Sequence, residues 1–206
     1  MPDPLDADLD RVIWLDGELR SPDEARISPF DHGITVGDGV FETLKVLDGV
    51  PFAMRRHLDR LGRSASALGL ETPPADLVRR AASDLIEATG ARDARLRITL
   101  TGGPGPLGSD RGDAGTTLLL ALAELTALPD TTAVCTVEWT RNERGALTGL
   151  KTTSYAENVL ALSVARRAGG SEALFANTVG NLCEGTGSNI FVGIGGRLVT
   201  PPLSAG

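Results

Sequence analysis

Hydrophobic and polar residues alternate along several short stretches of the first half of the chain. The stretches with this period-two pattern are residues 12–20, 40–46 and 94–101. The pattern predicts β-strands that bury one face. Asp16-Gly17 and Asp48-Gly49 are turn signals, and the second pair predicts that residues 40–54 form a hairpin. The apolar run at 116–123 is short enough for a buried strand.

A second pattern, with apolar residues three and four positions apart, predicts helices. The helices are expected at 54–70, 75–89 and 154–168. The apolar face of the first consists of Leu58, Leu61, Ala65 and Leu68. Arg56, Arg60 and Arg63 follow one another at spacings of four and three and line a second face. That face is either a solvated basic surface or an anion site suited to bidentate phosphate contact.

The order of these elements predicts two α/β domains. Residues 1–123 are expected to form a small N-terminal α/β domain, 124–130 a linker and 131–206 a C-terminal domain. The strands expected in the second domain are 133–139, 171–177, 182–184 and 189–194. Residues 102–115 are too rich in Gly and Pro for regular structure, so they form either a functional loop or a disordered one. Residues 197–206 end on a Pro-rich turn, so we expect the C-terminal domain to be incomplete.

Composition narrows the class of protein. A chain of 206 residues with a net charge of −7 is unlike a nucleic-acid-binding protein. Its apolar runs are too short for a membrane span, and its acidic N-terminus does not resemble a signal peptide. Cys135 and Cys183 are interpreted as reduced thiols of a cytoplasmic protein. The two histidines, His32 and His57, and the cysteine spacing give no metal-site pattern, so no metal is expected.

Lysine is scarce, since Lys45 and Lys151 are the two in the chain. A primary amine condenses with an aldehyde, which is how proteins hold pyridoxal phosphate (PLP). This cofactor also needs a cation for its phosphate and a partner for its pyridine nitrogen. Lys151 and Glu184 could supply the amine and the carboxylate, and an arginine the cation. Ser154 and Glu157 match a capping box, which predicts a helix that begins just after Lys151.

Four motifs in order carry a resemblance to a known family. They are DHG…GDGVFET at 31–43, HLDRL at 57–61, GLKTTSYAENVLA at 149–161 and CEGTGSNIF at 183–191. Together they resemble the class IV aminotransferases, or fold-type IV PLP enzymes. This family includes branched-chain and D-amino-acid aminotransferases and aminodeoxychorismate lyase. The resemblance runs from about residue 12 to the end. It implies a two-domain α/β fold with PLP in the cleft between the domains, and a homodimer.

The resemblance also implies roles for individual residues. Lys151 resembles the Schiff-base lysine, which also moves the substrate proton. Glu184 resembles the partner of the pyridine nitrogen, and Arg60 the phosphate ligand. Tyr155 is similar to a tyrosine near the ring hydroxyl in some members. Ser188, in the Gly-rich turn after Glu184, is a further candidate for cofactor binding.

The substrate side of the pocket is less well matched. Phe41 and Glu42 stand where the family lines this pocket. Thr101 stands where D-amino-acid aminotransferases and several lyases carry an arginine for the substrate carboxylate. The family also has a GITR-like phosphate-binding segment after a turn resembling TPPLSAG, and this chain ends before it.

These features predict an enzyme that moves an amino group between an amino acid and a 2-oxo acid through a Schiff base on Lys151. The alternative is aminodeoxychorismate lyase, which releases pyruvate and 4-aminobenzoate. The same residues serve both reactions, so the motifs alone leave the two open. A second alternative is a non-catalytic fragment or homologue that keeps the fold.

Overall fold

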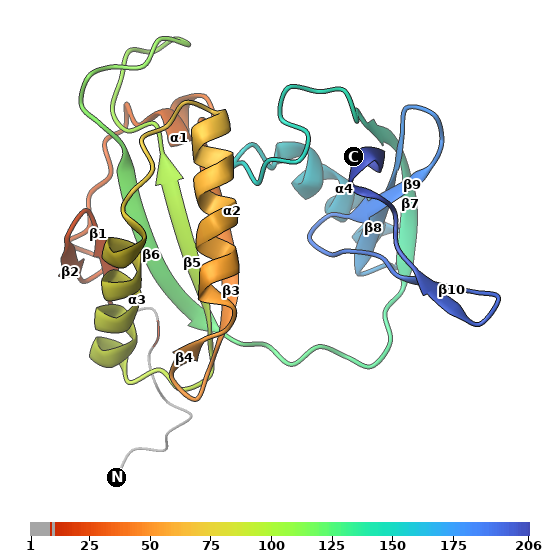
Figure 1. Ribbon diagram of the computed structural model, residues 1–206, viewed down its shortest axis with the longest axis horizontal. Helices are drawn as coiled ribbons and strands as arrows, with labels where there is room; N and C mark the ends of the chain where they lie inside the picture. The colour runs from red at the N-terminus through yellow and green to blue at the C-terminus, as the bar shows by residue number, and fades with distance from the viewer. Residues whose placement is uncertain (1–8, 10) are drawn as a thin grey trace. The chain divides into compact units, whose positions relative to one another are not determined.

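The computed structural model describes Leu9 and residues 11–206, which form two compact units of mixed α/β structure (Figure 1). The first unit extends to Thr126 and also includes Leu150–Thr153. The second unit comprises Ala127–Gly149 and Ser154–Gly206. The short segment around Lys151 therefore belongs to the first unit, although it follows the first part of the second unit in the sequence.

The first unit is built on a six-stranded sheet in the order β2-β1-β6-β5-β3-β4. The strands are β1 (Ile13–Leu15), β2 (Glu18–Arg20), β3 (Gly39–Leu47), β4 (Val50–Pro51), β5 (Ala94–Thr101) and β6 (Thr117–Glu124). Every neighbouring pair is antiparallel. The strands predicted from alternation are confirmed. Both Asp-Gly pairs have positive φ at both residues, as a two-residue hairpin turn requires.

Two long helices pack on this sheet, and both were predicted. Helix α2 (Met54–Ala67) packs on β3, and α3 (Ala75–Thr89) packs on β6 and β1. Gly90 ends α3 with φ 66°, as expected for a glycine cap. Helix α2 ends at Ala67 rather than residue 70, because Gly69 takes φ 70°. A four-residue helix, α1 (His32–Thr35), was not predicted.

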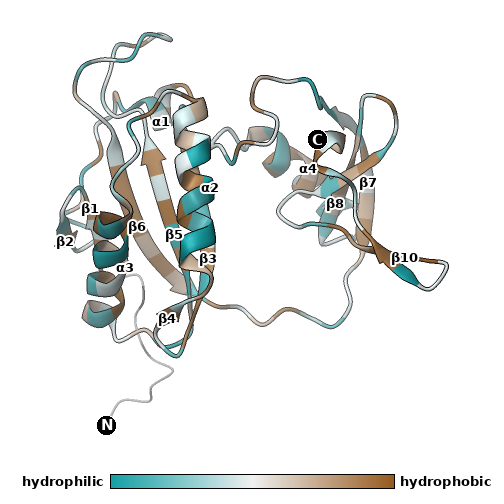
Figure 2. Cartoon of the chain, in the orientation of Figure 1, coloured by the Kyte–Doolittle hydropathy of each residue, from teal (hydrophilic) through white to brown (hydrophobic). Residues whose placement is uncertain are grey.

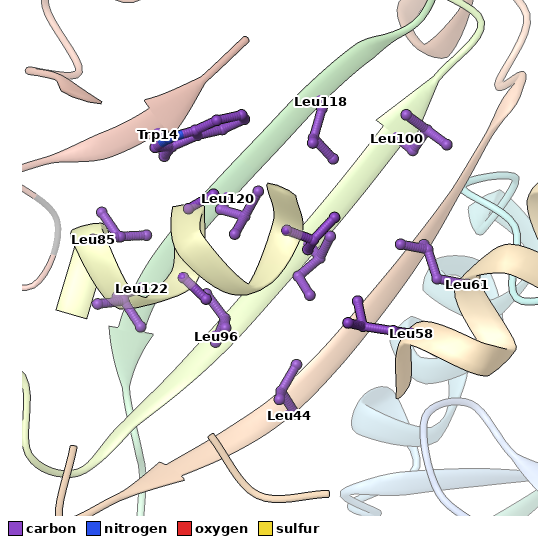
Figure 3. Packing of buried hydrophobic residues seen from close by; sticks show 14 of the residues in the cluster. Trp14, Leu44, Leu58, Leu61, Leu85, Leu96, Leu100, Leu118, Leu120 and Leu122 are labelled. Atoms are coloured by element: carbon purple, nitrogen blue, oxygen red, sulfur yellow. The ribbon is translucent and has the colours of Figure 1, made fainter. Parts of the chain in front are cut away.

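The core of the first unit lies between these helices and the sheet (Figure 3). Its members include Leu96 and Leu100 of β5, Leu118, Leu120 and Leu122 of β6, Leu58 and Leu61 of α2, and Leu85 of α3. Each fully buried leucine contributes roughly 1.5–3 kcal/mol through loss of apolar surface from water. Successive side chains of a strand point to opposite faces of the sheet. The residues that alternate with these leucines therefore lie on the face that the two helices do not cover.

The Gly- and Pro-rich loop between β5 and β6 is tied to the segment that leads into β3. Arg111 donates to both carboxylate oxygens of Asp38, with Nε to Oδ2 at 2.5 Å and Nη2 to Oδ1 at 2.7 Å. His32 Nε2 donates to the carbonyl of Pro106 at 2.9 Å. Gly103 has φ 69°, and an added Cβ would lie 1.8 Å from the carbonyl oxygen of Gly115. The loop thus has a defined path that depends on its glycines.

The second unit contains a three-stranded sheet in the order β7-β8-β9. Its elements are β7 (Val134–Arg141), α4 (Ala156–Arg167), β8 (Glu172–Asn177), β9 (Leu182–Gly185), β10 (Val192–Ile194), β11 (Arg197–Val199) and a 3-10 turn at Leu203–Ala205. Strand β7 is parallel to β8, so α4 serves as the crossover between them. A small cluster, which includes Val137, Ala165 and Phe175, forms the core.

Two local predictions for this unit are wrong. Helix α4 begins at Ala156 with Tyr155 as its N-cap, so it starts later than the predicted position just after Lys151. Glu157 accepts a hydrogen bond from Arg141 Nη1 at 3.2 Å. The strand expected at 189–194 is formed only by Val192–Ile194. Among the described residues, no helix combines the length and the apolar character that crossing a membrane requires.

Candidate active site

The backbone around Lys151 is fixed to the first unit by hydrogen bonds on two sides. Phe41 N donates to Lys151 O at 3.0 Å, and Thr153 N donates to Gly39 O at 2.8 Å. Lys151 N donates to Ser64 Oγ of α2 at 3.2 Å. The segment therefore acts as a short extra strand on β3. An added Cβ at Gly39 would lie 2.8 Å from the carbonyl oxygen of Leu100 and 3.0 Å from Thr153 Oγ1, so only glycine permits this close approach.

The side chain of Lys151 lies over a buried aromatic ring. Lys151 Nζ is 4.4 Å from the ring centroid of Phe41, and the guanidinium carbon of Arg97 is 3.6 Å from the same centroid. Phe41 is 4% exposed, so both cation–π contacts involve a fixed ring. Two cations on one ring create a local positive potential that favours a carboxylate or phosphate ligand.

Arg97 was not a candidate from the sequence. Its strand alternates, and an arginine at an alternating position is usually a solvent-facing residue. The register of β3 against β5 pairs Thr43 with Arg97 and Phe41 with Thr99. This pairing brings Arg97 within reach of the Phe41 ring, and a single sequence contains no signal of it.

Glu42 follows Phe41 and points to the opposite face of β3, towards α2. Its carboxylate is fully buried and accepts hydrogen bonds from Arg60 Nε to Oε1 at 2.6 Å and from Arg60 Nη2 to Oε2 at 2.6 Å. His57 Nδ1 donates to Oε2 at 2.8 Å. Glu42 therefore orients the guanidinium of Arg60. Charge-assisted bidentate pairs of this kind fix an arginine in one geometry.

The same stretch of α2 forms an open basic pocket of about 410 Å³. It is lined by Ala53, Arg56, His57, Asp59, Arg60 and Arg63. Figure 2 shows that hydrophilic residues predominate along this helix. The three arginines lie together on this open, solvent-exposed stretch of the helix, and their guanidinium groups suit a phosphate.

Thr101 has a structural partner. Its hydroxyl donates to Asp31 Oδ2 at 3.0 Å, and the hydroxyl of Thr117 donates to the same oxygen at 2.8 Å. Asp31 Oδ1 accepts from Gly33 N at 2.8 Å, so this buried carboxylate also caps α1. Thr101 lines a smaller pocket of about 170 Å³ together with Asp31 and Ile34.

In the second unit, Glu184 lies in β9 beside an arginine. Arg141 Nη2 is 3.5 Å from Glu184 Oε1. Arg141 Nη2 also donates to Asn158 Oδ1 at 2.9 Å, and the guanidinium carbon stacks 4.3 Å from the ring centroid of Phe175. The Glu184 side chain is 42% exposed. Its carboxylate is therefore partly exposed to solvent while it contacts the guanidinium of Arg141.

The remaining candidates also belong to the second unit. Ser188 Oγ donates to Glu172 Oε2 at 2.7 Å. Tyr155 stands at the N-cap of α4 and is partly buried. Lys151, Arg60, Phe41, Glu42 and Thr101 belong to the first unit and Glu184, Tyr155 and Ser188 to the second. In the part of the chain that the structure describes, no group of His, Cys, Asp and Glu side chains is arranged to hold a metal ion.

Comparison with known proteins decides the family. The sequence model of the family described as "Amino-transferase class IV" matches residues 39–206. This chain belongs to the class IV aminotransferase family. A putative branched-chain-amino-acid aminotransferase of Methanocaldococcus jannaschii is 35% identical over 201 residues, which cover 93% of this chain and 68% of that protein.

Two further comparisons show the range of this class IV aminotransferase's relatives. A bifunctional aminodeoxychorismate lyase / D-amino acid transaminase of Mycobacterium tuberculosis is 30% identical, covering 93% of this chain and 71% of the relative. The crystal structure of the Escherichia coli branched-chain amino acid aminotransferase matches with a TM-score of 0.89 and 26% identity. That match covers 95% of this chain and 69% of the other. The family and its fold, as the motifs predicted, are confirmed, and the relatives are aminotransferases or lyases.

Proposed function

We propose that this class IV aminotransferase uses PLP to move an amino group between an amino acid and a 2-oxo acid, with Lys151 as the covalent anchor. The observation that carries the proposal is the position of Lys151. Its backbone is bonded to β3 and α2, and its amine lies over Phe41 beside Arg97. Lys45, the other lysine, is exposed on β3 and lacks such a setting.

The chain carries side chains of each type that the cofactor needs, namely an amine, a cation and a carboxylate. When bound, PLP supplies an aldehyde that condenses with amines and a ring that accepts electrons from the substrate carbon. Arg60, which Glu42 orients at the edge of the basic pocket, would hold the phosphate. Glu184 would face the ring nitrogen, and Tyr155 and Ser188 are further candidates for contacts with the cofactor.

The residues of this chain would handle the substrate as follows. The amine of Lys151 would remove the proton from the substrate α-carbon and, in the aminotransferase reaction, deliver it to the cofactor. Arg97 would bind the substrate carboxylate. Thr101 is unsuited to this role, because it carries no charge and its hydroxyl donates to Asp31. The buried ring of Phe41 would keep water away from one side of the Lys151 amine.

A lyase reaction is the second candidate, and the bifunctional M. tuberculosis relative favours it. The same lysine and carboxylate would serve, and aminodeoxychorismate would lose pyruvate and leave 4-aminobenzoate. Release of pyruvate without any 2-oxo acid acceptor would establish the lyase. Strict dependence on an acceptor would establish the aminotransferase.

A homodimer in the cytoplasm is part of the proposal. The segment at 30–36 exposes the apolar side chains of Phe30, Ile34 and Val36, which self-association would cover. Cys135 and Cys183 are free thiols in the structure, as suits a reducing compartment. Sedimentation velocity would test the dimer, and a single monomeric species at micromolar concentration would contradict it.

Absorption and peptide mapping test the cofactor and its lysine together. The purified chain is mixed with PLP, its visible spectrum is recorded before and after borohydride reduction, and the pyridoxyl adduct is mapped by mass spectrometry. We expect a yellow band that bleaches and an adduct on Lys151. A Lys45→Arg variant should retain the band, and Lys151→Arg should lose it. An adduct on Lys45, or no band at all, would overturn the proposal.

A further inference from the structure

Glu172 has no role in the site described so far, yet it binds the turn that follows Glu184. Its Oε1 accepts hydrogen bonds from Thr186 N at 2.9 Å and from the hydroxyl of Thr186. Its Oε2 accepts from Ser188 Oγ at 2.7 Å. One carboxylate at the start of β8 therefore holds both polar side chains of the turn at 185–188.

The turn is also held from the side of α4. Asn158 Nδ2 donates to the carbonyl of Thr186 at 2.5 Å, and Asn158 itself is only 5% exposed. Asn158 Oδ1 accepts from Arg141, whose guanidinium lies beside Glu184. Thr186 is thus bound through its amide, its hydroxyl and its carbonyl, and the network continues to the carboxylate that precedes the turn.

The close approach of Glu172 depends on a glycine. An added Cβ at Gly185 would lie 2.5 Å from Ser188 Oγ and 2.9 Å from the carboxylate carbon of Glu172. Gly185 N donates to Ser188 O at 2.8 Å and closes the turn. Any side chain at this position would push the carboxylate away from its donors. The glycine and the glutamate therefore form one arrangement.

We propose that Glu172 is a positioning residue that holds the 185–188 turn and thereby fixes the carboxylate of Glu184 for the pyridine nitrogen. The inference rests on the proposed function of Glu184. Glu184 immediately precedes Gly185, the first residue of the turn. Motion of the turn would therefore change the orientation of the Glu184 side chain. A group that must meet a fixed ring gains from such preorganisation.

A purely structural role for Glu172 gives a different expectation. Glu172 also accepts from the amide of its neighbour Ala173 at 2.9 Å, which on its own would only begin the strand. In that case, its removal would lower stability and leave the environment of a bound cofactor unchanged. A local measurement on the turn and a spectrum of the cofactor separate the two roles.

The chain offers a matched control in Glu143. Its carboxylate accepts from Thr178 N at 3.1 Å and from Thr178 Oγ1 at 2.6 Å, the same pair of donors that Thr186 offers to Glu172. Glu143 binds the turn at 178–180 rather than the turn after Glu184. Glu143→Ala therefore removes an equivalent clamp without touching the 185–188 turn.

The first readout is hydrogen exchange of the amides at 185–188 without cofactor. Glu172→Ala should speed their exchange by on the order of tenfold or more, because hydrogen bonds to a charged group are lost. Glu172→Gln keeps an acceptor for Thr186 and should stay closer to the wild type. Glu143→Ala should leave these amides unchanged. Wild-type exchange in Glu172→Ala would overturn the proposal.

The second readout is the position of the visible band of bound PLP and its dissociation constant. Glu172→Ala should shift the band and weaken binding by on the order of tenfold, whereas Glu172→Gln should largely restore both. Faster exchange with a wild-type spectrum and affinity would reduce Glu172 to a structural residue and overturn the proposal. If the wild type binds no PLP, the proposed function fails, and the exchange result alone decides whether Glu172 holds the turn.

Discussion

Replacing Arg60 with alanine should destabilise the first unit as well as weaken phosphate binding. The carboxylate of Glu42 is fully buried, and Arg60 supplies two of its contacts, each at 2.6 Å. After the substitution, His57 is the one remaining donor among the contacts described above. A buried carboxylate that loses its cation loses both the Coulomb attraction and the hydrogen bonds that replaced water.

The magnitude follows from the burial of the two partners. Removing one member of a buried ion pair costs about 3–5 kcal/mol. The Arg60 side chain is 45% exposed, so water can replace part of the lost contact, and about 2–3 kcal/mol is a better expectation. In a Glu42→Gln background the charge is already absent, and Arg60→Ala should cost only about 1 kcal/mol. The two substitutions should therefore couple by at least roughly 1 kcal/mol.

Urea unfolding of the wild type, both single variants and the double variant measures this coupling. Arg63→Ala is the control, because Arg63 is exposed on the same helix. Its cost should stay within about 0.5 kcal/mol. If Arg60→Ala costs no more than Arg63→Ala, or the same with and without the Glu42 charge, the pairing with Glu42 does not stabilise the first unit. If the pairing does stabilise it, cofactor affinities of Arg60 variants must be compared at conditions where each variant is folded.

Three further predictions follow from other contacts. Asp38→Asn should release Arg111 and make the loop at 102–115 a faster site of limited proteolysis than in the wild type. Arg97→Lys should raise the KM for the amino acid by on the order of tenfold with a smaller change in kcat, because the bidentate fork is lost; Arg95→Lys is the control. Although partial burial would raise the pKa of Glu172, hydrogen bonds from the 185–188 turn hold that pKa below its ordinary value. The destabilisation caused by Glu172→Ala should therefore be full above the ordinary pKa of a glutamate and shrink as the pH falls through the lowered pKa.

Sequence periodicity predicted most of the secondary structure, because burial on one face repeats at a fixed spacing. Strand β5 was predicted with its observed ends, since its apolar residues alternate and the Gly-Gly pair that follows stops them. Helix α3 was equally clear because Gly90 ends it. The start of α4 was mispredicted for a different reason. Glu157 is committed to Arg141, a residue 16 positions earlier, and no local pattern contains that contact.

In the candidate site, too, the sequence indicates some residues, whereas the contacts of others depend on the tertiary fold. Scarcity and motif order drew attention to Lys151, but its contact with Phe41 depends on the pairing of 151–153 with β3. Phe41 and Glu42 were expected to line one pocket. Neighbouring residues of a strand face opposite sides, so alternation alone indicates that their side chains cannot share one face of the sheet. Arg97 was missed because only the cross-strand register brings it to the ring.

A common physical reason explains what the sequence could not reveal. Arg60 and Glu184 were candidates because motifs and chemistry point to charged residues. Their neighbours Glu42 and Glu172 act through distances set by the tertiary fold, where one buried or half-buried carboxylate collects several donors. Such partners are needed because a lone charged side chain samples many rotamers, and a ligand that binds one of them must offset the lost entropy. Substitution at Arg60 or Glu184 alone therefore measures the group together with its support, and only paired variants separate the two.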